Sequence, residues 1–188
     1  MEIYCVNYRE STAKMQIKQS LRQILRGKLP IIVCIGTDAV AGDSLGPLTG
    51  SLLKEKINGK TFIFGSMEST ITAKDVKSVA SFLEATYPYS QVLAIDAALG
   101  IKEEIGQIKI SDQPVKPGLG VNKNLQKIGT ASLLAVVEEK NLTKNLLPTV
   151  RFSLIYKMAE IISSAICEYC NECEFKIIKT NSKHEKAI

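Results

Sequence analysis

The stretch over residues 31–47 constrains the fold of this chain more than any other. It begins with a run of apolar residues, stops at a glycine and continues as a polar loop up to Pro47. Such a run is typical of a parallel strand that is buried on both faces, and Pro47 fits the first turn of a following helix. In open α/β sheets ligands bind beyond the carboxyl ends of the strands. The loop is therefore the first candidate site, and its acidic side chains are Asp38 and Asp43.

A second apolar run, over residues 91–100, carries an acid at a matching place, Asp96. If the two runs are neighbouring strands, Asp43 and Asp96 face each other across one crevice. Two carboxylates in a partly desolvated site repel when both are ionised, so one keeps its proton to a higher pH and the pair can divide the acid and base roles. The alternative interpretation is that Asp43 or Ser44 only caps the helix after the loop, a common role for these residue types.

The remaining pattern alternates between strands and helices. This alternation predicts a parallel sheet with helices on both sides. A short strand over 106–110 follows the second apolar run after a link too short for a parallel crossover, so we expect it to be antiparallel to its neighbour. Residues 1–10 fit either an edge strand or a loosely docked arm. The other expected elements are helices at 11–26, 47–56, 73–87 and 152–169 and strands at 61–65 and 131–137.

Length and composition limit the classes of protein that the chain can belong to. With 188 residues, 45% of them hydrophobic, it is expected to form a single domain over 1–179, with its core at about 30–172 and a polar, disordered tail at 180–188. The net charge of +5 comes partly from lysines near that tail, and no aromatic residues are interleaved with the basic ones, so no nucleic-acid partner is predicted. No segment resembles a secretory signal or a membrane span, which predicts a cytoplasmic protein without a membrane partner.

The sequence predicts no cofactor and no metal. The loop glycines have neither the dinucleotide-binding nor the P-loop spacing. Cys167, Cys170 and Cys173 fall short of a closed zinc site, which needs four ligands, and we interpret all five cysteines as reduced thiols. The single histidine, His184, lies in the polar tail. A histidine base in the crevice is therefore not expected.

Four ordered motifs, which together span about residues 30–166, resemble the YyaC-like family of sporulation proteins. The chain reads Thr70-Ile71-Thr72-Ala73 where the pattern of that family has a histidine. The motifs are Gly36-Thr37-Asp38 with Gly42-Asp43-Ser44-Leu45-Gly46-Pro47, Ala94-Ile95-Asp96-Ala97 with Leu99-Gly100, Lys116-Pro117-Gly118 with Gly120-Val121-Asn122-Lys123, and Lys157-Met158-Ala159-Glu160-Ile161-Ile162.

The YyaC-like family is similar in fold to the spore germination protease and, more remotely, to the hydrogenase-maturation endopeptidases. This resemblance implies a three-layer α/β/α sandwich with a five-stranded, mostly parallel sheet that contains one antiparallel strand. It also implies that Asp43 and Asp96 occupy the places of the two essential aspartates of the germination protease. The maturation endopeptidases hold nickel with carboxylates at these places and a histidine, which this chain does not supply.

The leading hypothesis is a sporulation-associated peptidase that acts on a peptide or protein substrate, with Asp43 and Asp96 as its catalytic pair. The expected substrate-binding residues are Asp38, Glu68, Asn122 and Lys123. Two alternatives stay open. One is a catalytically inactive binding or regulatory module, and the other is a metal-dependent endopeptidase that uses the pair with Glu68, a set of oxygen ligands that suits Mg, Ca or Mn. The sequence places the protein in the forespore or mother cell only through this resemblance, and it leaves homo-oligomers open.

Overall fold

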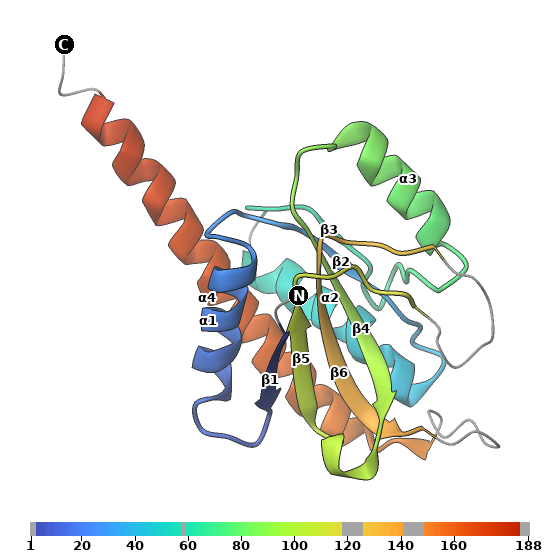
Figure 1. Ribbon diagram of the computed structural model, residues 1–188. Coiled ribbons are helices and arrows are strands. Elements are labelled where there is room, and N and C mark those ends of the chain that lie inside the picture. The colour runs from blue at the N-terminus through green and yellow to red at the C-terminus, as the bar shows by residue number, and fades with distance from the viewer. Residues whose placement is uncertain (1–2, 58, 118–125, 141–148, 185–188) are drawn as a thin grey trace.

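A mixed sheet of six strands forms the centre of the protein in a computed structural model, which describes residues 3–57, 59–117, 126–140 and 149–184, and their side chains as far as Cys173 (Figure 1). The strand order is β1-β5-β6-β4-β2-β3. The strands are β1 (Ile3–Asn7), β2 (Ile31–Cys34), β3 (Ile63–Phe64), β4 (Val92–Gly100), β5 (Gln107–Ser111) and β6 (Ala131–Glu139). The four α-helices of the described chain are α1 (Ala13–Ile24), α2 (Leu45–Ile57), α3 (Val76–Thr86) and α4 (Phe152–His184), and the short helical turns are η1 (Ala41–Ser44) and η2 (Lys102–Glu104).

The strand directions confirm the α/β class and a mostly parallel sheet. β6, β4, β2 and β3 pair in parallel, and β5 is antiparallel to both β6 and β1. The expected reversal of β5 is therefore confirmed, but its neighbours are β6 and β1 and not the preceding strand β4. The predicted count of five strands was wrong, because the N-terminal segment adds β1 as a sixth strand at one edge. Its pairing with β5 joins segments about a hundred residues apart, which local patterns cannot reveal.

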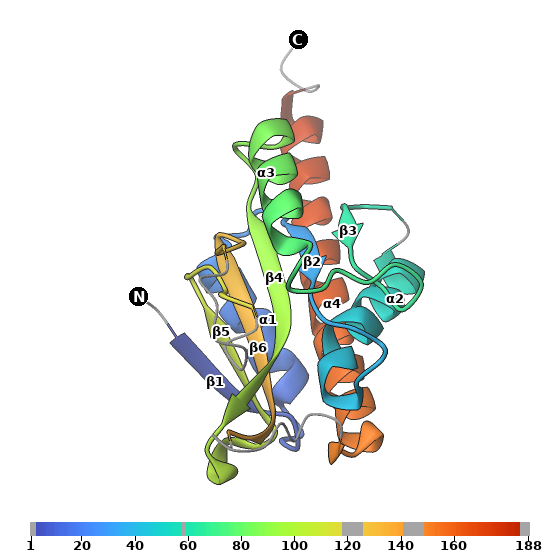
Figure 2. The ribbon, with the colours of Figure 1, turned by 90° about the vertical axis from the view of Figure 1, so that its right-hand side faces the viewer.

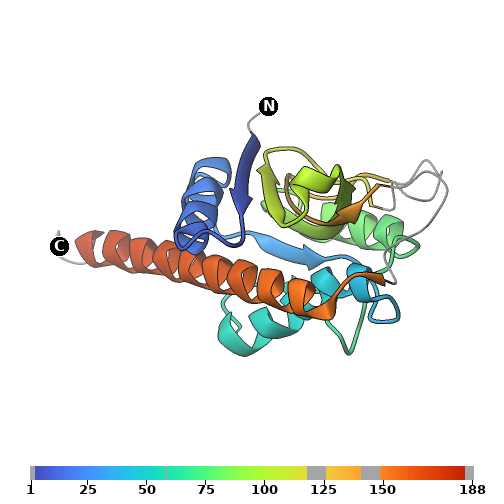
Figure 3. The same ribbon diagram turned by 90° about the horizontal axis from the view of Figure 1, so that it is seen from below.

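Helices cover both faces of the sheet, and each face has its own buried cluster. On β2, Ile32 and Cys34 point to the face that α1, α2 and α4 cover, whereas Ile31 and Val33 point to the face under α3. This alternation follows from the two-residue period of a strand. Figures 2 and 3 show the two helical layers from the side and from below, with α4 lying between α1 and α2. The apolar run at residues 31–35 is thus buried on both sides, as its composition predicts.

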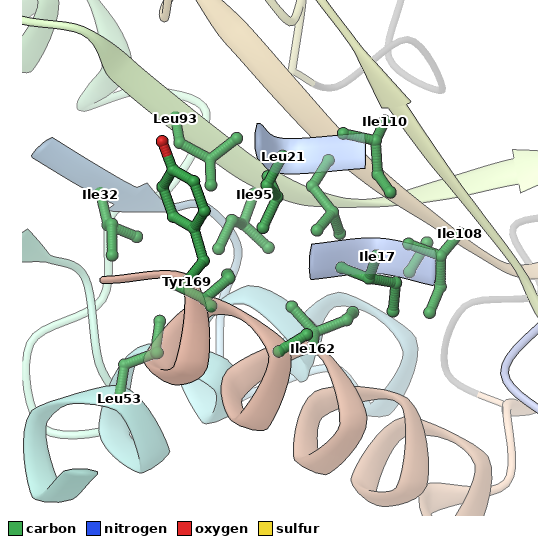
Figure 4. Packing of buried hydrophobic residues seen from close by; sticks show 14 of the residues in the cluster. Ile17, Leu21, Ile32, Leu53, Leu93, Ile95, Ile108, Ile110, Ile162 and Tyr169 are labelled. Atoms are coloured by element: carbon green, nitrogen blue, oxygen red, sulfur yellow. The ribbon is translucent and has the colours of Figure 1, made fainter. Parts of the chain in front are cut away.

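The long helix α4 holds the larger layer together. Figure 4 shows its residues Ile162 and Tyr169 packed among side chains of α1, α2 and the sheet. Tyr169 is fully buried, and its hydroxyl donates a hydrogen bond of 2.7 Å to the carbonyl of Lys28. The helix continues to His184, so the stretch expected as a polar tail begins inside it. No helix among the described residues is long and apolar enough to cross a membrane.

Candidate functional site

The carboxyl ends of β2 and β4 form the place where this sheet is expected to bind a ligand. From β2 the chain passes through α2 to β3, which lies on one side, and from β4 it continues to β5 and β6 on the other. Such a reversal of strand order is a topological switch point, where a crevice opens between diverging connections. Asp43 lies in η1 after β2, and Asp96 lies on β4 itself. The fold therefore places both predicted aspartates near the carboxyl end of β2, since Cys34, its last residue, pairs with Ile95.

The loop after β2 is held in place by close backbone contacts. Gly36 has φ = 139°, and a Cβ atom at this position would overlap the carbonyl oxygen of Asp43. The Gly36 amide donates a hydrogen bond of 2.9 Å to the carbonyl of Ile71, and the Thr37 amide donates one of 3.2 Å to the carbonyl of Asp43. Only glycine allows this conformation and this approach together. The half-buried Asp43 is consequently fixed against the end of β2.

Asp96 is the more deeply buried member of the pair. Its side chain is 6% exposed, although it lies on a central strand whose neighbouring positions are apolar. The amide of Ala97 donates a hydrogen bond of 2.9 Å to Asp96 Oδ1. A buried acid inside a central strand costs folding free energy, which makes Asp96 a candidate for a chemical role.

Asp43 is close enough to Asp96 to change the proton affinity of its carboxyl group. Burial raises the pKa of Asp96 well above its ordinary value, the negative charge of Asp43 raises it further, and the Ala97 amide opposes both effects. Burial also raises the pKa of Asp43, against the Thr37 amide. The first carboxyl group to ionise is that of Asp43, and Asp96 keeps its proton to higher pH. The arrangement supplies one base and one acid.

This pair makes the stability of the protein depend on pH. Because the pKa values of Asp43 and Asp96 are higher in the folded than in the unfolded state, their stabilising contribution is complete below about pH 4 and is lost as the pH rises through the folded values. We expect the free energy of unfolding of the wild type, relative to that of Asp96→Asn, to fall as the pH rises above about 4. Urea unfolding at several pH values measures it. Both proteins contain the same surface acids, such as Glu168, whose lowered pKa makes the free energy of unfolding change with pH in the opposite direction. These contributions cancel when the two free energies are subtracted. A difference that is constant with pH would contradict the expectation.

Two of the four other predicted site residues lie in the described part of the chain. Asp38 is exposed, and the local hydrogen bond in its turn comes from the Ala39 amide to Thr37 Oγ1, at 3.3 Å. Glu68 is exposed at the tip of a turn after β3. Asn122 and Lys123 lie outside the described residues. The backbone amides at Thr37 and Ala97 were missed, because a backbone donor leaves no signal in residue types.

Metal-binding side chains do not gather at the crevice. Among the described residues, no group of three or more His, Cys, Asp or Glu side chains is placed to hold a metal ion, so Glu68 does not complete a set with the two aspartates. Thr72, at the place where the family pattern has a histidine, bonds to Asp75 Oδ2 through its amide (2.9 Å) and its hydroxyl (2.7 Å) at the start of α3. No disulfide links the five cysteines. Burial raises the pKa of the Cys34 thiol to about 12, as befits a core residue and not a nucleophile.

Comparison with known proteins agrees with the motifs in the sequence. Residues 5–165, from β1 into α4, match a protein family described as a protein of unknown function, DUF1256. The uncharacterised protein YyaC of Bacillus subtilis (strain 168) is 32% identical over 165 residues, which cover 86% of this chain and 80% of that protein. Both Asp43 and Asp96 fall inside the family match. The chain therefore belongs to the DUF1256 family, and the YyaC-like resemblance of its motifs is confirmed.

Proposed function

We propose that this protein is a sporulation-associated hydrolase that cleaves peptide bonds with Asp43 and Asp96. The observation that carries the proposal is the buried carboxyl group of Asp96 at the switch point of the sheet, whose pKa the nearby, half-buried Asp43 raises further. The association with sporulation, and the peptide bond as the target, rest on the resemblance of the motifs to the YyaC-like family and through it to the fold of the spore germination protease.

The two aspartates divide the chemistry by their burial. The ionised Asp43 accepts a proton from a water molecule, whose oxygen adds to the carbonyl carbon of the substrate. The protonated Asp96 donates its proton to the carbonyl oxygen, which gives a diol. The carbon–nitrogen bond of the diol then breaks as Asp43 passes its new proton to the leaving amine. A hydroxyl proton of the diol returns to Asp96, so the carboxylic acid product leaves with the pair restored. The half-buried Asp43 can contact solvent water, whereas the burial of Asp96 keeps its proton in place until a substrate arrives.

A binding or regulatory module is the second candidate. The observation that favours it is Thr72, which replaces the histidine of the family pattern and is engaged with Asp75 at the start of α3. A chain that had lost its chemistry would keep the crevice and bind a partner there without cleaving it. The metal-dependent alternative finds less support, since no group of three or more His, Cys, Asp or Glu side chains among the described residues is placed to hold a metal ion.

A digest of natural peptides tests the proposal directly. A peptide library prepared from Bacillus subtilis proteins is incubated with the wild type, Asp43→Asn and Glu55→Gln, and new chain ends are identified by mass spectrometry. We expect new ends with the wild type and with Glu55→Gln, which removes an exposed carboxylate from α2, and at least about a hundredfold fewer with Asp43→Asn. New ends that are equally abundant with Asp43→Asn, or no new ends with the wild type, would rule out the proposed hydrolase.

A further inference from the structure

Strand β4 continues well past the end of its neighbour β2. The last paired residues are Cys34 of β2 and Ile95 of β4, whereas on its other side β4 stays paired with β6 as far as Gly100 (Figure 1). After Ile35 the chain of β2 turns away, and the Gly36 amide bonds to Ile71 instead. The edge of β4 beyond Asp96 therefore has no neighbouring strand on the side of β2 among the described residues.

The hydrogen-bond pattern shows which groups face this open edge. The backbone groups of odd-numbered residues of β4 face β2, since the Ile35 amide donates a hydrogen bond of 2.8 Å to the Ile95 carbonyl. Even-numbered residues bond to β6 and its extension, since the Lys140 amide donates 2.8 Å to the Gly100 carbonyl. Because peptide groups of a strand alternate in direction, the Leu99 amide and the carbonyls of Ala97 and Leu99 face the open side. These three groups lie on the side of β4 where the pairing with β2 has ended.

This open edge begins at the catalytic pair. Asp96 is the residue before Ala97, and its carboxylate accepts a hydrogen bond from the amide of Ala97. Leu99 lies about 10 Å further along the strand, at about 3.3 Å per residue. Residues 97–100 are half-buried and thus reachable. A strand added here would pass directly beside the two carboxyl groups.

We propose that the substrate binds as an extended polypeptide segment that pairs with residues 97–99 of β4 and so places one of its peptide bonds at Asp43 and Asp96. The inference rests on the proposed function. An extended peptide is the ligand whose own amides and carbonyls complement a free strand edge. The recognition is mainly by main chain, and the small side chains of Ala97 and Ala98 leave room for the side chains of the substrate. The substrate class is therefore an unfolded or exposed segment and not a folded surface.

Leu99→Pro tests the docking without touching the pair. Proline removes the amide that faces the open edge, and the Leu99 amide is not used by the β4–β6 ladder, so the variant should fold. Leu99→Ala is the matched control, since it shortens the side chain and keeps the amide. With a peptide cleaved by the wild type, we expect Leu99→Pro to raise KM about tenfold with a smaller change in kcat, and Leu99→Ala to stay within about threefold of the wild type. Thermal melting verifies that all variants are folded.

Hydrogen exchange gives a second readout that does not need cleavage. In the free protein the Leu99 amide should exchange much faster than the Ala98 amide, which lies in the ladder with β6. Adding the Bacillus subtilis peptide library to Asp96→Asn should slow the exchange at Leu99. If the library slows this exchange but the wild type cleaves nothing, the docking stands and the proposed hydrolysis fails. If cleavage occurs but Leu99→Pro matches the wild type, the hydrolysis stands and the docking is wrong. Protection of Leu99 that depends only on protein concentration would assign the edge to a second copy and overturn the proposal.

Discussion

Asp96→Asn is expected to cleave substrate about 10²- to 10⁴-fold more slowly than the wild type and yet to melt at a higher temperature. Asparagine has nearly the shape of the protonated aspartic acid and can still accept from the Ala97 amide, but it has no proton to give to the substrate. At neutral pH the wild type must bury a charge at this position or take up a proton that its unfolded chain does not hold, and asparagine needs neither. Removing that cost should stabilise the fold by about 2 kcal/mol, or roughly 4–8 °C.

The two effects of Asp96→Asn are measured on the same preparation, by the cleavage rate of one peptide and by thermal unfolding at pH 7. Asp75→Asn is the contrasting variant. Hydrogen bonds from Thr72 lower the pKa of the exposed Asp75, so its carboxylate stabilises the start of α3, and its loss should lower the melting temperature slightly with little effect on cleavage. A lower melting temperature for Asp96→Asn would mean that the buried carboxyl group serves the fold and not the chemistry.

Gly46→Ala is expected to lower the free energy of unfolding by about 3 kcal/mol, the upper part of the usual range for overpacking. A Cβ atom on Gly46 would overlap the carbonyl oxygen of Ile35, and the next atoms that it meets are also backbone atoms of Ile35. No side chain can rotate away, so the first turn of α2 must move off the end of β2. Because Asp43 lies three residues earlier, the same shift should impair cleavage.

Gly59→Ala separates this overlap from backbone strain. Gly59 has φ = 76°, but nothing lies within 4 Å of an added Cβ atom. Alanine at this position costs only the free energy of adopting the left-handed conformation, about 1–2 kcal/mol. The substitution should leave cleavage unchanged. Urea unfolding of both variants at one pH, with a cleavage assay, provides the comparison. Equal losses of stability, with equal activities, would show that α2 can move away from β2 without consequence for the site.

The features that the sequence predicts well are those written into local patterns. The apolar run at 31–35 needs a buried strand, and Pro47 together with the loop before it needs a helix start, so β2 and α2 follow. Asp43 follows the first run and Asp96 lies within the second, and the two come together because the parallel strand β2 ends opposite Ile95, the residue before Asp96. The reversal of β5 follows from the shortness of the link before it.

The features that the sequence does not predict depend on pairing between distant segments or on backbone groups. The position of β6 between β4 and β5 decides which strands β5 contacts, and nothing in residues 107–111 encodes it. The free edge beside Leu99 arises because β2 pairs for four residues and β4 continues for nine. A comparison of the two apolar runs could have suggested this, since the second is longer. Asp38 and Glu68 were chosen for their charge and their place in loops, which do not determine where an exposed side chain points.

The pairing of β1 also determines how late in synthesis of the chain this strand can find its partner. Ile3 lies opposite Ser111, so β1 has no partner until more than a hundred further residues have been added. At a synthesis rate of about 5–20 residues per second, β1 stays unpaired for roughly 5–20 s. The strand β5 also pairs with β6, which is synthesised later still. During that interval α1 and β2 are complete while the outer edge of the sheet is not. Nascent chains of this protein should therefore depend on the chaperones that meet them at the ribosome exit more than the finished fold would suggest.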